Sequence, residues 1–416
     1  MTEMLDDINL FSPEVIEDPY PAYRVLREND PVHYFDGLNL WILTRFEDVH
    51  NAFRDDRLSI DYETYQVNRM GPGALDQPYY RVGKEMLVCK DPPDHTRLRR
   101  IFRKALTPEI AKSLAPIAEE VATRCADEFA DRGHAELMLE YAAQVPVTVT
   151  SQLLGVPRSD HEKIADLIRD FAPTMTPPPM PPEQLARTNE VCEALMEYFG
   201  RHVERKREDP GDDLTSALIR ANAEDEESLH SEELLANMPF LYFAGQDTQT
   251  NLLGNVIVAL DRNRDQLAWL IEDPSRVDDC MHELLRYDTS GQVIGRTAKE
   301  DVEIAGKTIP AGHTVMLCMG AANRDPAHFE DPEKLDLQRP ARPASELNYI
   351  SFGAGRHRCL GIYVAQTNFP ITLRILLERL PFESVQIDYE DAERCMDLQQ
   401  RGYDRLPIEW SANGRR

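Results

Sequence analysis

Apolar side chains recur at helical spacing along most of the chain. They lie three and four residues apart in long runs with polar residues between them, a period that is typical of amphipathic or buried helices. Seven such stretches predict helices: Pro19–Glu28, Asp94–Leu106, Glu109–Arg132, Gln184–Lys206, Ser231–Leu260, Val277–Tyr287 and Gly361–Leu380. Pro239 lies inside the fifth stretch, where a proline costs about 3 kcal/mol or kinks the helix.

Strand signals are short and few. The segment Pro31–Thr44 predicts two strands around a turn at Asp36-Gly37, and Val302–Leu317 predicts a hairpin. Cys395–Trp410 predicts a further small hairpin that turns at Arg401-Gly402. Strands and helices do not alternate, which argues against a doubly wound parallel sheet. The pattern therefore predicts a mainly α fold with small β-sheets.

Length and composition fit one large domain. The chain has 416 residues, enough for two or three domains, but no flexible linker separates them, so we expect a single domain over residues 1–416. The net charge of −27 argues against nucleic acid and anionic membranes as partners. No apolar stretch approaches the ~18 residues needed to span a bilayer. The acidic N-terminus, Met1–Asp7, lacks the features of a signal peptide, which predicts a cytoplasmic protein.

One cysteine stands apart from the other six. The seven cysteines are scattered, odd in number and without a Cys-x-x-Cys pair, which argues against a disulfide framework or a structural zinc site. Six are expected to be small buried hydrophobic residues. Cys359 follows a glycine-rich turn and directly precedes an amphipathic helix. The helix N-terminus, together with Arg356 and Arg358, would lower the pKa of this thiol.

The residues alone leave other roles for Cys359 open. A catalytic nucleophile would need a general base, but His357, two residues away around a tight turn, should point elsewhere. A zinc site lacks partner ligands. A buried structural cysteine explains neither the glycines nor the basic flank.

The segment Phe352–Gly361 (FGAGRHRCLG) resembles the haem-binding signature of the cytochrome P450 family in its bacterial form. The matching anchor positions are Phe352, Gly353, Gly355, His357, Cys359, Leu360 and Gly361. The resemblance implies a single-domain P450 fold and a soluble enzyme of the ferredoxin-dependent type. It also implies haem b as cofactor, with Cys359 as the iron ligand and Phe352, His357 and Gly361 in contact with the haem.

A second motif, Phe243–Asn251 (FAGQDTQTN), lies in the longest apolar helix. Asp247 and Thr248 need a reason there, because burying unpaired polar groups is costly; an ordinary kinked helix with a hydrated polar face explains them equally well. The motif resembles the family's Ala-Gly-x-Asp/Glu-Thr stretch, where the helix opens for dioxygen. By that resemblance Ala244 lies against the haem, Thr248 donates to the distal oxygen and Asp247 relays protons. Gln249 replaces a second threonine of many relatives.

A third motif lies between the two already described, at Glu283 and Arg286. Glu283 and Arg286, three residues apart on a helix, are usually a surface pair. Here they resemble the family's Glu-x-x-Arg, which with Arg339 would form a structural network behind the haem.

His95 and Arg99 lie one helical turn apart, so both can reach one anionic group. A solvated basic helix face is the plainer interpretation of Arg99. By resemblance to the family, His95, Arg99, Arg296 and His357 would bind the haem propionates.

Basic residues are concentrated in two segments of an otherwise acidic chain, one between His95 and Lys104 and one that flanks Cys359. If the fold is as implied, they border the thiolate side of the haem and would dock an acidic ferredoxin; internal pairing with nearby acids is the alternative. These residues are Arg97, Arg100, Arg103, Lys104 and Arg358. The chain has no Gly-x-Gly-x-x-Gly motif or flavin region, so electrons from NAD(P)H would arrive through ferredoxin reductase and ferredoxin.

The resemblance also places a largely apolar substrate pocket near Phe243, Gln292, Val293, Ile294 and Gln399. We therefore expect a haem-thiolate monooxygenase that activates dioxygen and hydroxylates or epoxidises a largely apolar small molecule. Oxidative coupling or desaturation would use the same motifs. A non-catalytic haem-binding sensor is a further alternative, against which the Asp247 and Thr248 pair argues.

Overall fold

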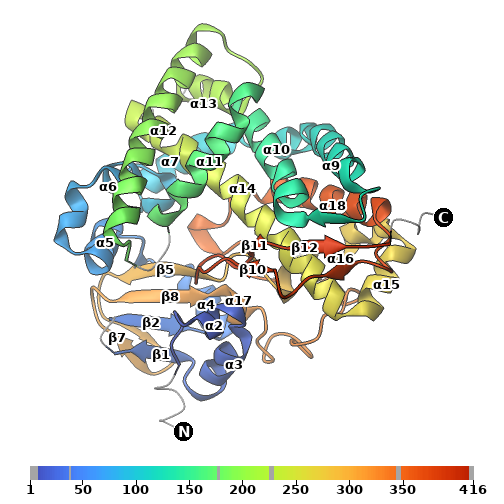
Figure 1. The fold of residues 1–416 in the computed structure, drawn as a ribbon. Helices are drawn as coiled ribbons and strands as arrows, with labels where there is room; N and C mark the ends of the chain where they lie inside the picture. The colour runs from blue at the N-terminus through green and yellow to red at the C-terminus, as the bar shows by residue number, and fades with distance from the viewer. Residues whose placement is uncertain (1–7, 37–38, 176–178, 224–228, 343–347, 412–416) are drawn as a thin grey trace.

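The computed structural model describes residues 8–36, 39–175, 179–223, 229–342 and 348–411. Most of these residues are helical, the sheets are small, and the molecule has a triangular outline (Figure 1). The predicted fold class, mainly α with small β-sheets, is confirmed. The acidic N-terminus and Gly37 of the predicted first turn lie outside the described residues.

The α-helices run over the following residues: α2 Pro13–Glu17, α3 Tyr20–Asn29, α4 Phe46–Ala52, α5 Tyr62–Met70, α6 Pro78–Gly83, α7 Asp94–Ala105, α8 Pro108–Ser113, α9 Ala115–Phe129, α10 Gln144–Leu154, α11 His161–Phe171, α12 Pro182–Glu208, α13 Leu214–Ala223, α14 Ser231–Arg262, α15 Arg264–Glu272, α16 Val277–Tyr287, α17 Met319–Ala322 and α18 Ile362–Arg379. The strands are β1 Val32–Phe35, β2 Leu40–Leu43, β3 Leu58–Ser59, β4 His134–Glu136, β5 Val293–Ala298, β6 Val302–Ile304, β7 Lys307–Ile309, β8 Thr314–Cys318, β9 Gln386–Ile387, β10 Glu393–Arg394, β11 Tyr403–Arg405 and β12 Pro407–Glu409.

One predicted helix is in fact two. The stretch expected to be helical over Glu109–Arg132 divides into α8 and α9 around Leu114. Pro116 lies in the first turn of α9, where its missing N–H is tolerated but the preceding helix cannot continue through it unchanged. The other predicted helices are present with each end within two residues of its predicted place, and α14 continues through Pro239 without a break.

The largest sheet joins strands from three parts of the chain. Its order is β1-β2-β8-β5-β3. β1 and β2 pair antiparallel as predicted, whereas β2 and β8 are parallel. The hairpin expected over Val302–Leu317 is shorter than predicted, because only β6 and β7 form it and β8 joins the main sheet.

The hairpin predicted over Cys395–Trp410 is wrong in its pairing. β11 pairs with β10, which begins before Cys395, and β12 pairs with β4 and β9 in another sheet. No tight turn forms at Arg401-Gly402, because the Arg401 N–H donates to the Ser290 carbonyl at 2.7 Å. Tertiary contacts therefore decide the path of this segment.

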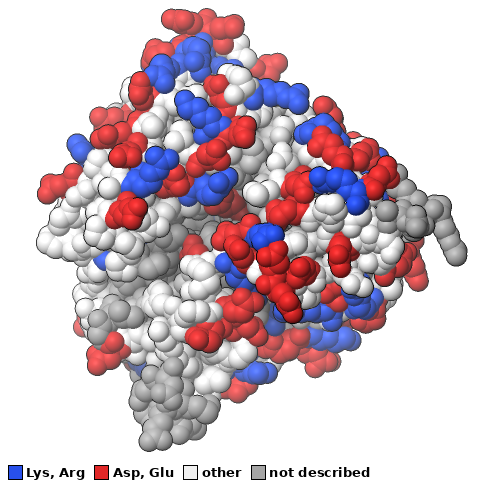
Figure 2. Space-filling model, in the orientation of Figure 1, with Lys and Arg blue, Asp and Glu red and all other residues white. Residues whose placement is uncertain are grey.

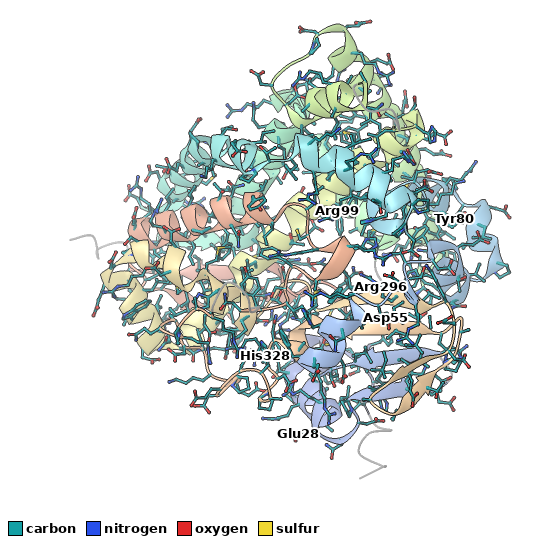
Figure 3. The ribbon with its side chains drawn as sticks, turned by 180° about the vertical axis from the view of Figure 1, so that it is seen from behind. Glu28, Asp55, Tyr80, Arg99, Arg296 and His328 are labelled. Carbon is teal, nitrogen blue, oxygen red and sulfur yellow. The ribbon has the colours of Figure 1, made fainter. Side chains whose placement is uncertain are left out.

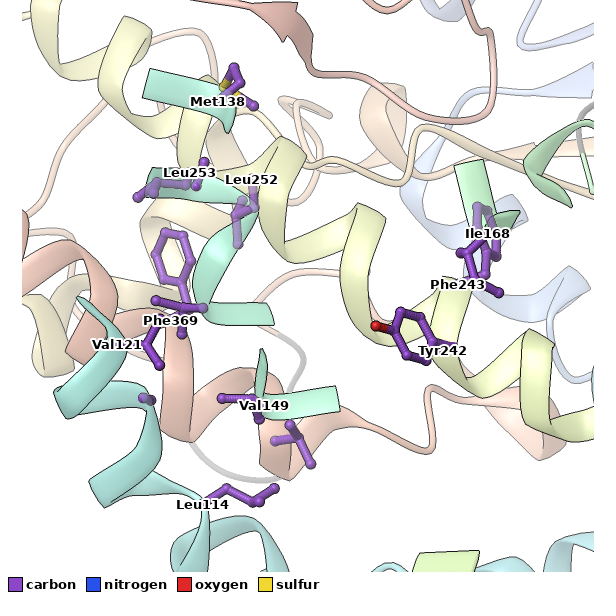
Figure 4. Close-up of a cluster of buried hydrophobic side chains, with 14 of the residues drawn as sticks. Leu114, Val121, Met138, Val149, Ile168, Tyr242, Phe243, Leu252, Leu253 and Phe369 are labelled. Carbon is purple, nitrogen blue, oxygen red and sulfur yellow. The ribbon is translucent and has the colours of Figure 1, made fainter. Parts of the chain in front are cut away.

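α14 runs diagonally through the molecule (Figure 1) and is held by apolar packing along its length. Figure 4 shows Tyr242, Phe243, Leu252 and Leu253 of this helix among side chains from neighbouring helices, including Phe369 of α18. Full burial of one such side chain contributes about 1.5–3 kcal/mol, so the two ends of the motif at residues 243–251 are fixed by the core. Within the described segments, no helix is long and apolar enough to cross a membrane.

Candidate active site

A cavity of about 280 Å³ lies between α7, α10, α14, β5 and the loop that precedes α18. This volume is far above the ~10–15 Å³ that one buried water needs, so the cavity is not a packing defect. Apolar side chains from α10 and α14, among them Leu153, Phe240 and Leu252, form much of its wall. Polar groups enter at only a few places. Such a lining is typical of a small-molecule or cofactor site.

The loop before α18 places Cys359 in the wall of this cavity. Gly353 and Gly355 have φ values of 65° and 66°, which glycine adopts without strain. A Cβ at Gly355 would lie 2.2 Å from the Phe53 carbonyl oxygen. The Cys359 N–H donates to the Phe352 carbonyl at 2.9 Å, closing the turn. The glycines therefore serve the turn that presents the thiol, as the sequence predicts.

The charges around Cys359 differ from the sequence expectation. Burial raises the pKa of the Cys359 thiol and outweighs the lowering effect of the Gly361 N–H, Arg99 and Arg358. Arg356 is paired with Asp56 instead. The lowered pKa that the sequence predicts is therefore not found for the thiol itself. A coordinated metal ion would deprotonate such a thiol outright.

Of the other six cysteines, five are buried as expected and Cys395 is only half-buried. No group of three or more metal-ligating His, Cys, Asp and Glu side chains occurs among the described residues.

Four basic side chains converge beside the cavity from three parts of the chain. His95 and Arg99 of α7 and His357 of the cysteine loop line it, and the fully buried Arg296 of β5 lies close by. The rings of His95 and His357 are 4.0 Å apart. Figure 3 shows Arg99 and Arg296 reaching the middle of the molecule from α7 and β5.

Burial and mutual repulsion keep this basic cluster partly uncharged. Burial, with a contribution from Arg99, lowers the pKa of His95 to about 4. Burial and the Arg296 charge lower the pKa of His357 to about 2. Burial also lowers the pKa of Arg296 to about 10. An anion placed among these groups would therefore be strongly favoured.

Unpaired polar atoms in the same cluster point to such an anion. His95 Nε2, His357 Nε2 and Arg296 Nη2 are buried, and none has a hydrogen-bond partner in the part of the chain that the structure describes. Leaving buried donors unpaired costs about 1–3 kcal/mol each. Carboxylates such as the two haem propionates would satisfy them. The basic cluster and the thiol in the cavity wall together fit a haem.

The polar motif of α14 contains residues that line the cavity and residues that do not. Thr248 lines the cavity, and its hydroxyl donates to the Ala244 carbonyl at 3.0 Å. Gln249 and Thr250 make the same bond to the carbonyls of residues 245 and 246, each at 3.0 Å. Such bonds to the carbonyl four residues earlier slightly destabilise and bend a helix. α14 is nevertheless continuous at this point.

Asp247 does not line the cavity, and its side chain is half-buried beside it. Burial raises the pKa of this carboxyl to about 7, against the lowering effect of Arg169, while Asp397 and Asp404 raise it further. Because its pKa is close to neutrality, Asp247 can both accept and release a proton near pH 7.

Glu283, Arg286 and Arg339 meet in a network close to the cysteine loop. Arg286 Nε and Nη2 donate to the two carboxylate oxygens of Glu283 at 2.7 and 2.8 Å, and Arg339 Nε lies 3.0 Å from Glu283 Oε2. The remaining donors of Arg286 bond the carbonyls of Asn323, Pro332 and Lys334. Because every N–H of this fully buried guanidinium is bonded, the network fixes the chain behind the cavity.

The side chains expected to contact substrate divide into two groups. Val293, Ile294 and Gln399 line the cavity. Phe243 packs in the core, with its ring centroid 6.4 Å from that of Phe171. Gln292 is buried behind the wall, where its Nε2 donates to the Thr289 carbonyl at 2.7 Å. The sequence does not show which of these side chains the fold turns towards the cavity.

Sequence reasoning missed several parts of the lining, including Thr289, Ser290 and Gly291 between α16 and β5. Thr150, Leu153 and Leu154 of α10 and Leu214 of α13 also face the cavity. No signal in the chain distinguishes these residues from core positions, because apolar residues at helical spacing look the same in both settings.

The basic residues expected to dock a redox partner fall into two groups, one paired inside the protein and one exposed. Arg97 donates to both carboxylate oxygens of Glu233, at 2.6 and 2.9 Å, and to Asp94 at 3.1 Å. This is the internal pairing that was the alternative. The other four residues are exposed: Arg100, Arg103, Lys104 and Arg358.

A family model described as Cytochrome P450 matches residues 42–398 of the chain. The chain belongs to the cytochrome P450 family. It is 34% identical to the vitamin D(3) 25-hydroxylase of Pseudonocardia autotrophica, over 96% of both chains. It is 32% identical to the 6-deoxyerythronolide B hydroxylase of Saccharopolyspora erythraea, over 94% of this chain and 96% of that one.

A solved P450 structure agrees with the fold. P450BioI, in complex with an acyl carrier protein ligated to hexadec-9Z-enoic acid, superposes with a TM-score of 0.86 at 28% identity and covers 96% of this chain and 100% of its own. The predicted fold and enzyme class are thus confirmed: the protein is a cytochrome P450 monooxygenase. Members of this family bind haem and use dioxygen as co-substrate.

Proposed function

We propose that this P450 hydroxylates or epoxidises a largely apolar small molecule with electrons supplied by a ferredoxin. The observation that carries the proposal is that Cys359 and Thr248 line one largely apolar cavity. The two relatives named above as hydroxylases support oxygen insertion over oxidative coupling, desaturation or haem sensing. The single-domain extent over residues 1–416 and the cytoplasmic location stay predictions.

Cys359 would bind the haem iron, and His95, Arg99, Arg296 and His357 would bind the propionates. Three further residues of the cavity wall would lie against the haem: Ala244, Phe352 and Gly361. When bound, a thiolate-ligated haem supplies the electron-rich iron that activates dioxygen. Every other task falls to the protein, which must orient the substrate, exclude water and deliver protons.

Proton delivery would use Asp247 and Thr248 in sequence. Asp247 is half-buried, and its carboxyl interacts with Arg169, a largely exposed residue of α11, so solvent can reach this carboxyl from the side of α11. Thr248 is the next residue and faces the cavity. Asp247 would take protons from the solvent side, and the Thr248 hydroxyl would donate them at the cavity.

The substrate would carry one or two hydrogen-bonding groups on an apolar skeleton. Thr289, Ser290, Gln399 and Gln400 are grouped on one part of an otherwise mainly apolar wall. Apolar contacts would supply most of the affinity, and the grouped polar residues would fix orientation.

Electrons from NAD(P)H would pass through ferredoxin reductase to ferredoxin, and ferredoxin would dock around Arg358. This exposed arginine directly precedes Cys359, and Arg100, Arg103 and Lys104 lie exposed on α7. Arg99 of the same helix ties the two segments together by donating to the Arg358 carbonyl at 2.5 Å. In the view of Figure 2, acidic side chains gather over the C-terminal strands, an unfavourable surface for an acidic protein. Arg97 is left out, since Glu233 holds it.

Charge reversal at this surface should slow electron transfer. We expect Arg103→Glu and Arg358→Glu to lower the rate of reduction by ferredoxin about tenfold at low ionic strength, with the difference shrinking as salt screens the charges. The measurement is stopped-flow reduction at several salt concentrations. Arg24→Glu, the same change at an exposed site on α3, is the matched control. Rates that are equal in all variants and at all salt concentrations would contradict electrostatic docking.

The oxygen atom of the product tests the reaction itself. Apolar compounds that shift the haem spectrum would be turned over with ferredoxin, its reductase, NADPH and ¹⁸O₂. Incorporation of one labelled atom per product molecule is the expected result. A coupled or desaturated product without label would establish the alternative chemistry, and haem reduction without any product from binding compounds would favour the sensor.

A further inference from the structure

A buried polar network lies behind one wall of the cavity. Its centre is Asp288, which accepts a hydrogen bond from the Tyr20 hydroxyl at 2.6 Å and another from Arg401 Nε at 2.8 Å. All three side chains are buried, with exposed fractions of 7%, 8% and 5% for Asp288, Tyr20 and Arg401. In such surroundings a carboxylate and a guanidinium are stable only while they remain paired and hydrogen-bonded.

The network joins segments that are far apart in the sequence. Arg401 Nη1 donates to the carbonyls of Ile16 and Glu17 at 3.2 and 2.9 Å, which ties the end of the chain to its N-terminal part. Asn255 of α14 donates to the Arg401 carbonyl at 2.9 Å. The guanidinium of Arg324 lies 3.4 Å from the centre of the Tyr20 ring, which adds a cation–π contact on the other side.

The same residues are continuous with the cavity wall. Thr289, Ser290 and Gly291 follow Asp288 and line the cavity, as do Gln399 and Gln400, which precede Arg401. Backbone hydrogen bonds join these two segments. The Arg401 N–H donates to the Ser290 carbonyl at 2.7 Å, the Gln292 N–H donates to the Gln399 carbonyl at 2.8 Å, and Gly291 and Gln400 form an isolated β-bridge.

Gln292 belongs to this network as well. Its Nε2 donates to the Thr289 carbonyl at 2.7 Å and lies 3.4 Å from the Tyr20 hydroxyl. A residue that the sequence placed in the substrate pocket therefore acts from behind the wall.

We infer that Tyr20, Asp288 and Arg401 are positioning residues that hold the wall formed by residues 289–291 and 399–400 in one geometry and so determine which ligands fit the cavity. The inference rests on the proposed function only in that haem and substrate occupy this cavity. The network touches no reacting atom. Its effect is to fix the polar groups of the wall. Because backbone hydrogen bonds join residues 289–291 to residues 399–400, a shift at Asp288 or Arg401 moves both segments together.

Tyr20→Phe is the sharpest test, because it removes the hydroxyl that bonds Asp288 and keeps the ring that contacts Arg324. The haem-loaded variant would be titrated with imidazole, which needs only the iron, and with 4-phenylimidazole, whose extra ring extends into the cavity. We expect the ratio of the two dissociation constants to change roughly twofold to tenfold, the range for one lost hydrogen bond. Arg401→Lys should change the ratio in the same way.

Tyr141→Phe is the matched control. It removes another buried hydroxyl, which donates to the Thr372 carbonyl at 2.7 Å and does not line the cavity. Amide hydrogen exchange gives a readout that does not need haem: the N–H groups of Gln292 and Arg401 should exchange faster in Tyr20→Phe than in Tyr141→Phe.

The outcomes separate this inference from the proposed function. A changed ligand ratio together with faster exchange in Tyr20→Phe alone supports the positioning role. Equal ratios, or equal exchange when no haem binds, would overturn it. Absence of the thiolate spectrum from the wild-type protein would instead refute the proposed function, and the exchange comparison would still decide the inference.

Discussion

Replacing Cys359 with serine is expected to abolish the strongly red-shifted Soret band of the reduced, carbon monoxide-bound protein, and turnover with it. The band depends on electron donation by a thiolate, which an alcohol oxygen does not reproduce. Among the cysteines that the structure describes, Cys359 is the one in the cavity wall. The basic cluster that fits the propionates is unchanged by the substitution, so the variant should still take up haem. The measurement is the difference spectrum with haem content determined in parallel.

Cys395→Ser is the matched control for this experiment. Cys395 is also only half-buried, but its thiol contacts Asp404 Oδ1 at 3.2 Å and Asn251 Oδ1 at 3.6 Å outside the cavity. The same exchange of sulfur for oxygen there should leave the spectrum unchanged. A red-shifted band that persists in Cys359→Ser and disappears in Cys395→Ser would show that Cys395 is the iron ligand and would contradict the prediction.

The sequence predicts the features that local pattern determines. Long apolar runs at helical spacing predict α12, α14 and α18 closely, because their buried faces extend over many turns. Gly353 and Gly355 predict the turn that presents the cysteine, since both need a positive φ. The family motifs then predict which side chains gather at the cavity.

Tertiary contacts decide the rest. Arg97 looks like an exposed member of a basic stretch, yet it pairs with Glu233, 136 residues away in the sequence. Gln292 looks like a pocket residue, but it lies just before β5 and its side chain points towards Tyr20. The pKa of Cys359 is raised because burial outweighs the nearby arginines, and burial cannot be read from the order of residues. Each difference concerns the orientation of a side chain, its distant partner or its burial, and the local periodicity of the sequence determines none of these.

Replacing Asp247 with asparagine is expected to lower the rate of product formation roughly 100-fold, within the range typical of lost general acid–base catalysis. The amide has nearly the same shape but cannot carry a proton from solvent to the cavity. Asp247 does not line the cavity, so substrate affinity should change little. The expected result is therefore a lower kcat with nearly unchanged KM, measured with saturating ferredoxin so that electron supply does not limit the rate.

The pKa of Asp247 also predicts the direction in which kcat changes with pH. Burial raises the pKa of Asp247 to about 7, so the carboxyl is mostly protonated below that pH and mostly ionised above it. If Asp247 delivers the proton in its protonated form, kcat of the wild-type protein should fall as pH rises through about 7. The asparagine variant should lack that decline, because its amide does not titrate in this range. A variant profile that keeps the wild-type inflection would place the titrating group elsewhere.

Thr248→Ala distinguishes the relay from the group that donates at the cavity. Thr248 lines the cavity, while Asp247 lies behind it. Loss of the threonine hydroxyl should leave electron consumption fast but reduce the fraction of electrons recovered in product. Loss of the aspartate should slow electron consumption and product formation together. If both variants instead waste electrons to the same extent at wild-type consumption rates, the two residues act at one step and the order proposed for them is wrong.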